Sequence, residues 1–240
     1  MQLAHDHDFH LLFWITRGQG LVLLDGMRRG VGAHNVMFIP AESLYAIELG
    51  RQCLGHVVCI PVGTPMRLPE IPRHLRIREV HAQSELTNLY ETALREDQGT
   101  RPLRHDALEG HAALISVWLR RQIMEEGHAP AKRNAAQRLS AAFLTQVSQR
   151  YRTGAPMAQY AASLDVTPTH LTRAVKAATG KTAAELLTER VLHEARLLLA
   201  ETGYPARQIA EHLGFGSAAY FTRFIQQHTG LPPSKLRSSA

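Results

Sequence analysis

Two segments of the chain, about fifty residues apart, are imperfect copies of one pattern. The first reads YAASLDVTPTHLTRAVKAATG over Tyr160–Gly180, and the second reads IAEHLGFGSAAYFTRFIQQHTG over Ile209–Gly230. Each has a small residue in a short first helix, an apolar residue that ends this helix, a tight turn and a longer second helix that closes on Thr-Gly. The pattern predicts two helix-turn-helix motifs. In such motifs the first helix lies across the DNA backbone and the second enters the major groove.

The turns and the helix starts of both copies carry suitable residues. Gly214 supplies a permissive backbone in the second turn, and Asp165, which tolerates left-handed geometry, fills the equivalent place in the first. Thr167-Pro168 predicts an N-cap followed by proline at the first helical position, and Ser217 is the expected N-cap of the other copy. These residues fix where each second helix starts.

Helical periodicity divides each second helix into an inward and an outward face. Leu171, Val175, Phe221 and Phe224 are expected to point inward. The candidate DNA-binding residues are Thr169, His170, Thr172, Arg173 and Lys176 in the first copy, and Ser217, Ala219, Thr222, Arg223 and Gln226 in the second. Arginine can donate two hydrogen bonds to guanine, and the methyl groups of Thr and Ala suit the thymine methyl.

The distribution of charge supports this prediction. Residues 1–133 contain 15 Lys/Arg and 15 Asp/Glu, whereas residues 134–240 contain 12 and 6, so the whole net charge of +6 lies in the part with the repeats. A basic excess of this kind is typical of a surface that binds a polyanion, with a merely solubilising surface as the alternative. The sequence has no secretory signal and no apolar run of about 18 residues, so we expect a cytoplasmic protein without a membrane span. Cys53 and Cys59 are expected to be buried, reduced thiols.

Short strands separated by turn signals fill the N-terminal part. They are expected at Phe9–Thr16, Leu21–Gly26, Val36–Pro40, Leu44–Leu49 and Gly55–Pro61, with Asp25-Gly26 as a hairpin turn. Strands at this spacing predict a small antiparallel sandwich or barrel. Two amphipathic helices follow, one from Ser84 and one over Leu108–Gln122, which cap the barrel, pair with a second subunit or do both. Thr182–Thr202, stopped by Gly203, is predicted to be a rigid helical connector between the repeats.

Several runs of residues carry a family resemblance. They are Arg190–Leu199 in the connector, Ile209–Phe215, Tyr220–Phe224 and Thr229–Arg237. On these residues the C-terminal part of the chain resembles the DNA-binding domain of the AraC/XylS family of bacterial transcription regulators. The resemblance implies that the two second helices enter consecutive major-groove segments on one face of the duplex. By residue matching, bases are read by Thr169, Thr172 and Arg173 through the first helix, and by Ala219, Thr222 and Arg223 through the second.

The chain departs from the family pattern in its basic residues. The family usually carries Phe-Lys at the positions of Val175-Lys176 and again at those of Ile225-Gln226, so one phosphate-binding lysine is missing. This departure implies weaker or more context-dependent binding.

The N-terminal strands resemble the cupin-type sensor domain of the same family. His5-Asp-His7 is similar to the paired histidines of metal cupins, which ligate a metal through imidazole nitrogen. However, Tyr45 stands where a further histidine is expected, and the glutamate after the pair is absent. We therefore expect no metal and no cofactor, with His5, His7 and His10 at an exposed terminus or lining a pocket.

An effector inside the barrel would contact inward side chains. The candidates are His10, Phe13, Trp14, Arg17, Phe38 and Tyr45. Alternation puts Phe13 and Ile15 on one face of the first strand and Trp14 on the other, and it leaves open which face is inside. A cluster of aromatics with His10 and Arg17 near the mouth would suit a small aromatic anion. The alternative is that the aromatic residues only fill the core.

The expected architecture is α+β: a cupin-like sensor barrel over residues 1–82, a helical dimerisation or capping segment over 83–127, a linker over 128–134, and an all-α double helix-turn-helix DNA-binding domain over 135–240. We expect a DNA-binding transcription regulator and not an enzyme, because no catalytic Ser/His/Asp arrangement or phosphate-binding loop is found. The expected partners are double-stranded promoter DNA, a small-molecule effector, a second copy of the chain through residues 84–126, and RNA polymerase if the protein activates.

Two other functions remain open on the sequence. One is a regulator without a ligand, whose barrel is only a dimerisation scaffold. The other is a cupin-type metalloenzyme with an accessory nucleic-acid-binding domain, which would need metal ligands that the sequence does not supply.

Overall fold

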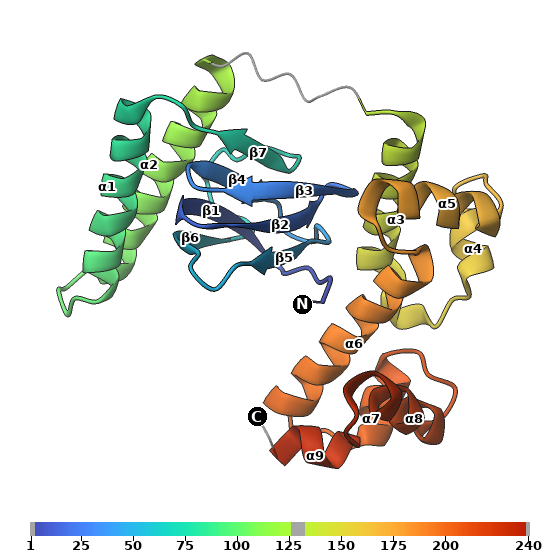
Figure 1. The fold of residues 1–240 in the computed structure, drawn as a ribbon. Helices are drawn as coiled ribbons and strands as arrows, with labels where there is room; N and C mark the ends of the chain where they lie inside the picture. Colours follow the sequence, from blue (N-terminus) through green and yellow to red (C-terminus); the bar gives the residue numbers. More distant parts are fainter. Residues whose placement is uncertain (1–2, 126–132, 239–240) are drawn as a thin grey trace.

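The computed structural model describes residues 3–125 and 133–238. Figure 1 shows strands in the centre, two long helices on one side of them, and the helical C-terminal part on the other side. The predicted α+β class, a β-sandwich with two helices followed by an all-α double helix-turn-helix part, is confirmed. Residues 128–132 of the predicted linker lie outside the described residues.

The described strands form two antiparallel sheets. They are β1 (Phe9–Arg17), β2 (Gln19–Leu24), β3 (Met27–Gly32), β4 (Asn35–Ile39), β5 (Ala46–Leu49), β6 (Leu54–Pro61) and β7 (Arg73–Arg76). One sheet has the order β6-β1-β4-β7 and the other has the order β3-β2-β5. The sequence pattern does not predict β3 or β7. β3 contains two arginines and two glycines, and β7 is short and charged, so neither shows apolar alternation. Pairing with a neighbouring strand makes both of them extended.

The first strand separates two apolar layers. Trp14, on one face of β1, packs with the helices, and its indole N–H donates to the Thr87 hydroxyl at 3.0 Å. Ile15 faces the other sheet, and the half-buried Phe13 packs on the same side. Because successive side chains of a strand point to opposite faces, this contact decides the question that the sequence leaves open. Phe13 lies inside the sandwich, and Trp14 lies beneath the helices.

Helices α1 (Val80–Asp97) and α2 (Arg104–Glu125) cover the four-stranded sheet. They lie side by side on the face of the sheet away from the C-terminal part (Figure 1). Tyr90 of α1 is buried against the sheet, and its hydroxyl donates to the Leu12 carbonyl at 2.7 Å. α1 begins at Val80, four residues before the predicted start at Ser84. The apolar stripe did not indicate this first turn, because Val80 is exposed and does not belong to the stripe.

The C-terminal part is helical throughout its described length. Its helices are α3 (Ala135–Arg150), a short 3-10 turn (Tyr151–Thr153), α4 (Met157–Ala162), α5 (Pro168–Thr179), α6 (Ala183–Glu201), α7 (Ala206–His212), α8 (Ala218–Thr229) and α9 (Pro233–Ser238). α4 with α5 and α7 with α8 are the two helix-turn-helix units. α6 is the predicted connector and runs from one unit to the other (Figure 1).

The two parts of the chain share an apolar core. Ala4, Leu23 and Leu44 come from the strand-rich part and are buried in the same cluster as Leu171 and Val175 of α5. The tip of the β2–β3 hairpin also touches α3. There Ser140 donates a hydrogen bond to the Gly26 carbonyl at 2.8 Å. The barrel and the first helix-turn-helix unit are therefore packed directly against each other.

The prediction that both cysteines are buried is wrong. Both are free thiols, but Cys53 is half-buried and Cys59 is exposed. Cys59 lies on β6, an edge strand, where Val57 and Cys59 are both exposed. Within the described residues, no helix is both long enough and apolar enough to span a membrane.

Candidate DNA interface and ligand cavity

The second helix of the first unit, α5, begins where its capping residues predict. Thr167 is extended, with φ −78° and ψ 153°, and its hydroxyl accepts from the His170 backbone N–H at 3.2 Å. Pro168 occupies the first helical position, where no N–H is needed. Asp165 in the turn has a φ of 55°, the left-handed geometry expected for it.

The second unit repeats this construction with different residues. Ser217 caps α8, and its hydroxyl accepts from the Tyr220 backbone N–H at 3.2 Å. Gly214 in the turn has a φ of 75°. α5 and α8 both end on a left-handed glycine, Gly180 and Gly230.

The candidate base-reading side chains are accessible. Thr172 and Thr222 are half-buried, and the remaining candidates are exposed: Thr169, His170, Arg173, Lys176, Ser217, Ala219, Arg223 and Gln226. Neither Arg173 nor Arg223 forms an ion pair with any described residue, so both guanidinium groups keep their hydrogen-bond donors for an external acceptor. Phe221 is buried, whereas Phe224, expected inward, is half-buried against the Phe215 ring.

The connector α6 sets the spacing of the two units. Its 19 residues make a rod of about 28 Å at 1.5 Å per residue. This length approaches one turn of B-DNA, about 34–36 Å, which separates successive major-groove segments on one face of the duplex.

A close backbone contact also fixes the second unit on the first. A Cβ on Gly214 would lie 2.5 Å from the Arg152 carbonyl oxygen, and a Cβ on Gly154 would lie 2.3 Å from the Gly214 carbonyl oxygen. The turn of the second unit thus rests on the loop before α4, where only glycine fits. This contact restricts rotation of one unit against the other.

A buried ion-pair network joins the barrel to the connector. Arg190 of α6 pairs with Asp6 of the N-terminal segment, and also with Glu194 at 3.1 Å. It donates to the Tyr151 hydroxyl at 2.7 Å, while Arg152 binds the other oxygen of Glu194 at 2.6 Å. Burial opposes ionisation of Glu194, but the charges and hydrogen bonds of Arg190 and Arg152 together outweigh it and lower the pKa of this carboxyl. Every charge in the network has an opposite partner, as buried charges require.

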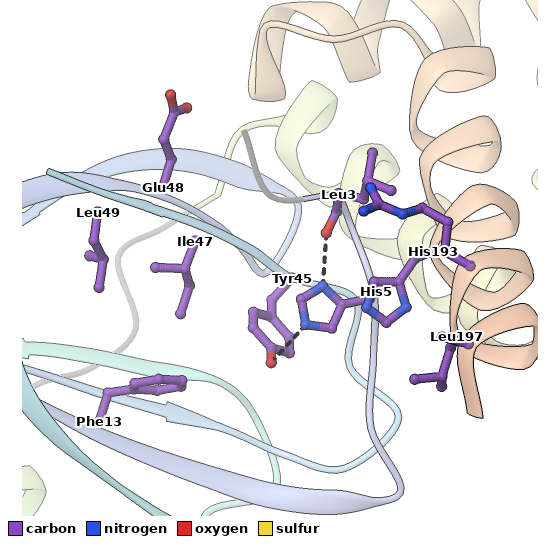
Figure 2. Close-up of a pocket in the computed structure, with 11 residues that line it drawn as sticks. Leu3, His5, Phe13, Tyr45, Ile47, Glu48, Leu49, His193 and Leu197 are labelled. Atoms are coloured by element: carbon purple, nitrogen blue, oxygen red, sulfur yellow. Dashed lines mark hydrogen bonds between the residues drawn. The ribbon is translucent and has the colours of Figure 1, made fainter. Parts of the chain in front are cut away.

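A cavity of about 860 Å³ lies between the barrel and α6. Figure 2 shows its two walls, with β5 and the N-terminal segment on one side and α6 on the other. The lining residues are Leu3, His5, Phe13, Tyr45, Ile47, Glu48, Leu49, His193, Arg196, Leu197 and Ala200. Such a volume lies in the range of small-molecule sites, which are mostly apolar with a few polar groups.

Two histidine rings meet at the join between the walls. The rings of His5 and His193 are stacked with centroids 4.2 Å apart (Figure 2). Nδ1 of His5 donates to the Leu3 carbonyl at 2.8 Å, because a carbonyl can only accept. Nε2 of the neutral ring therefore accepts from the Tyr45 hydroxyl at 3.0 Å. Nδ1 of His193 is buried and has no hydrogen-bond partner in the described structure.

The environment keeps these histidines neutral. Burial lowers the pKa of His5, with a smaller contribution from the Arg190 charge. Burial lowers the pKa of His193 to about 4, and the neighbouring His5 and Arg190 act in the same direction. Burial raises the pKa of Tyr45. At neutral pH the cavity therefore presents uncharged rings and a protonated phenol.

The structure does not bring the six predicted effector residues together. Phe13 and Tyr45 line the cavity. Trp14 and Phe38 lie on the opposite face of the sheet beneath α1 and α2. His10 stacks near Phe38, and its Nδ1 accepts from the Ala41 backbone N–H.

The predicted grouping of His10 with Arg17 at a barrel mouth is corrected by the register of β1. Both residues belong to this strand but lie seven positions apart, which is about 23 Å along an extended chain. Arg17 is exposed at the end of the strand.

Sequence reasoning missed the α6 side of the cavity. His193, Arg196 and Leu197 belong to the connector, and no local pattern indicates that the barrel packs there. On the barrel side, the alternation of Ile47 and Leu49 in β5 could have indicated that both residues face the cavity.

The described residues contain no group of three or more His, Cys, Asp or Glu side chains arranged to hold a metal ion. His5 and His7 lie near each other, with ring centroids 5.0 Å apart, but the hydrogen bonds to Leu3 and Tyr45 occupy both nitrogens of His5. His5 instead belongs to the join between the two parts of the chain, where it stacks on His193.

The geometry so far defines a DNA-binding protein with two helix-turn-helix units on a rigid connector. Residues 160–239 match a protein-family model described as a helix-turn-helix domain. The resemblance to the AraC/XylS regulators is confirmed over this segment, and the chain is a DNA-binding transcription regulator.

Searches of known proteins give weaker likenesses. The curated proteins contain no match. The C-terminal domain of AraT, a response regulator from Geobacillus stearothermophilus, is 24% identical with a TM-score of 0.41, over 45% of this chain and 87% of that one. ToxT from Vibrio cholerae O395 is 13% identical with a TM-score of 0.45, over 98% and 92% of the two chains. An AraC-type regulator from Chromobacterium violaceum is 24% identical with a TM-score of 0.35, over 40% and 90%. With scores below 0.5, none of these likenesses bears on the function.

Proposed function

We propose that the chain is an effector-responsive regulator that reads two consecutive major-groove segments of promoter DNA. α5 reads the first segment through Thr169, Thr172 and Arg173, and α8 reads the second through Ala219, Thr222 and Arg223. The observation that carries this proposal is a pair of exposed arginines without ion-pair partners among the described residues, on two capped helices joined by the 19-residue connector α6.

The effector site of this proposal is the cavity between the barrel and α6. Its walls come from both parts of the chain, so separating the parts would dismantle it. A ligand that binds here binds the docked arrangement better than an undocked one, and such a difference in affinity is what shifts a conformational equilibrium. By linkage, the effector then changes DNA affinity and DNA changes effector affinity by the same factor.

The lining favours a small organic acid with an apolar body. Phe13, Leu49 and Leu197 supply apolar contact, and Arg196 is an exposed guanidinium without an ion-pair partner among the described residues. The unpartnered Nδ1 of His193 offers one further polar contact. The lining also contains one carboxylate, Glu48 on the barrel wall, so an organic acid would place its carboxylate at Arg196 on the α6 wall.

The DNA part of the proposal is tested by replacing Arg173 with alanine. The variant should bind its selected site about 1–3 kcal/mol more weakly and lose preference at one base pair, because a bidentate contact to guanine is removed. Binding is measured on a panel of sites with single base-pair changes. Arg101→Ala, which removes an exposed arginine between α1 and α2, is the control. An Arg173→Ala profile identical to that of the control would refute the assigned role.

The effector part is tested with a panel of aliphatic and aromatic carboxylic acids. We expect at least one to raise the thermal unfolding temperature of the full chain and to shift its DNA affinity, with both effects reduced in Arg196→Gln. Acids that stabilise the protein equally in Arg196→Gln bind elsewhere. The absence of any response across the panel would favour a barrel that serves only as a scaffold.

The same proposal includes a homodimer formed through residues 84–126, RNA polymerase as a partner if the protein activates, a cytoplasmic location and no catalytic activity. The exposed large apolar residues of α1, α2 and their connection support the dimer: Val80, Leu94, Leu103, Leu114 and Met124. A mass that stays monomeric over a hundredfold range of concentration would exclude the dimer.

A further inference from the structure

The barrel places one arginine beside the first recognition helix. Arg28 lies on β3, next to the hairpin turn that touches α3. A Cβ built on Gly180, at the C-terminal end of α5, would lie 3.6 Å from Nη1 of Arg28. Arg28 is exposed, and no hydrogen bond or ion pair from its guanidinium to a described residue is found. Its donors are therefore available to an external acceptor.

Arg28 lies on the DNA-facing side of α5. Arg173, Lys176 and Gly180 follow one another at spacings of three and four residues, so they lie on one face of the helix. Arg173 and Lys176 are candidate DNA contacts and are exposed. Arg28 also shares the lining of a small surface cavity with Ala177, the exposed neighbour of Lys176. The barrel arginine thus continues the row of basic side chains that the recognition helix begins.

The length of α5 brings its C-terminal end to the DNA backbone. The helix has 12 residues, about 18 Å in length, whereas the major groove is about 12 Å wide. When the N-terminal residues of a recognition helix contact base edges, its other end emerges beside the phosphates that border the groove. The guanidinium beside Gly180 is at this end.

Local charge agrees with this placement. Glu48 is the one carboxylate in the lining of the adjoining cavity, which also contains Arg28 and Lys181, and it forms no ion pair with Arg28. Lys181 is held by Glu189, with Nζ and Oε1 2.5 Å apart. Among the residues that the structure describes, Arg28 and Lys176 are cations without an ion-pair partner at this end of α5.

We propose that Arg28 of the sensor barrel binds a DNA phosphate next to the segment read by α5, so that the docked barrel is part of the DNA interface. This inference rests on the DNA-binding function. It adds a contact from the part of the chain without helix-turn-helix units. It also links docking of the barrel to DNA affinity, because separating the barrel from α5 would remove the Arg28–phosphate contact.

The test is the salt dependence of DNA binding by the full chain. Arg28→Gln should reduce the slope of log K against log salt by about 0.9, the value for one lost phosphate contact. It should weaken binding to cognate and unrelated DNA equally, because a phosphate contact carries no sequence information. Arg28→Lys should keep the wild-type slope. Arg101→Gln, which removes the same charge far from α5, is the matched control.

Three outcomes separate the alternatives. A slope for Arg28→Gln equal to that of Arg101→Gln overturns the proposal. A lower unfolding temperature with that unchanged slope would mean that Arg28 only stabilises the C-terminal end of α5 and the docking of the barrel. Failure of the DNA-binding function itself would look different, because the wild-type chain would then select no site and Arg173→Ala would have no effect.

Discussion

At the scale of single residues, the most constrained positions are those where two backbones touch. Gly214 combines a φ of 75° with a neighbouring carbonyl oxygen 2.5 Å from any added Cβ. Asp165 has the same left-handed geometry in the first unit, and that position accommodates a side chain. The two turns therefore tolerate different residues, although both perform the same change of direction.

Replacement of Gly214 by alanine should destabilise the chain by about 1–3 kcal/mol, since it adds both left-handed strain and a clash with the loop at Arg152. Chemical denaturation measures the loss. Gly216→Ala is the matched control, because nothing lies within 4 Å of its Cβ position, and it should change stability by less than about 0.5 kcal/mol. Equal losses of stability in the two variants would show that the backbone contact at Gly214 does not contribute to stability.

At the scale of elements, the ends of helices follow from side chains that are visible in the sequence. Thr182 caps α6, and its hydroxyl accepts from the Glu185 backbone N–H at 3.2 Å. The Glu185 carboxylate accepts in return from the Thr182 backbone N–H at 2.6 Å. This reciprocal pair is a capping box, and it starts the connector that separates the two reading helices.

We expect Thr182→Ala to cost about 1 kcal/mol of stability, because it leaves an N–H of the first turn without its acceptor. The pKa of Glu185, lowered chiefly by its hydrogen bonds to Thr182, should rise in the same variant. Denaturation and NMR titration measure the two effects. Thr145→Ala, at an exposed position inside α3, is the control and should have little effect. An unchanged Glu185 pKa would contradict the capping role.

Strands follow less directly from the sequence than helix ends do. β1 and β6 have enough apolar residues to be predicted, but β3 and β7 become strands by pairing with β2 and β4. The energy of a strand comes from its neighbours across the ladder, and that neighbourhood is absent from a local pattern.

At the scale of the whole molecule, the packing of the barrel on α6 determines how the parts communicate. The Arg190 network, the stacked His5 and His193 rings and the buried Ala4 all lie at this junction. The cavity lies beside them. Because these contacts come from segments more than 180 residues apart, one change at the junction affects both the sensor and the DNA-binding part.

Acid should weaken this junction. The folded-state pKa of His193 is about 4, below the value of about 6.5 in an unfolded chain. Between these two values the unfolded state binds more protons, so stability is complete above about pH 6.5 and falls as the pH drops toward 4. Protonated His193 would also face Arg190 and His5, with Glu194 as the nearest compensating charge.

Thermal unfolding at pH 7 and pH 5 measures this effect, and the loss should be smaller in His193→Gln than in the wild-type chain. His74, whose pKa burial lowers to about 4 within the barrel, contributes in the same pH range. His74→Gln is therefore the control for a histidine away from the junction. Hydrogen exchange in the N-terminal segment at pH 5 should increase in the wild type and change less in His193→Gln.

The sequence by itself determined the local features of this protein. The N-caps Thr167 and Ser217, the turns at Asp165 and Gly214, and the length of the connector all depend on contacts within a few residues, so they could be predicted together with the DNA-binding class. The hairpin at Asp25-Gly26 belongs to the same group, since its two positive φ angles are a local requirement.

Only the tertiary structure decided which face of β1 is inside, where the cavity lies and that Arg28 meets α5. Trp14 would be buried on either face of the sheet. Its packing against α1 and α2 shows that it lies on the helix-covered face. His193 and Arg196 lie on a helix whose pattern fits a plain connector. They meet the barrel because apolar surface is buried between segments far apart in the sequence. The hydrophobic effect is not directional, so a local sequence pattern does not show which distant segment a helix will pack against.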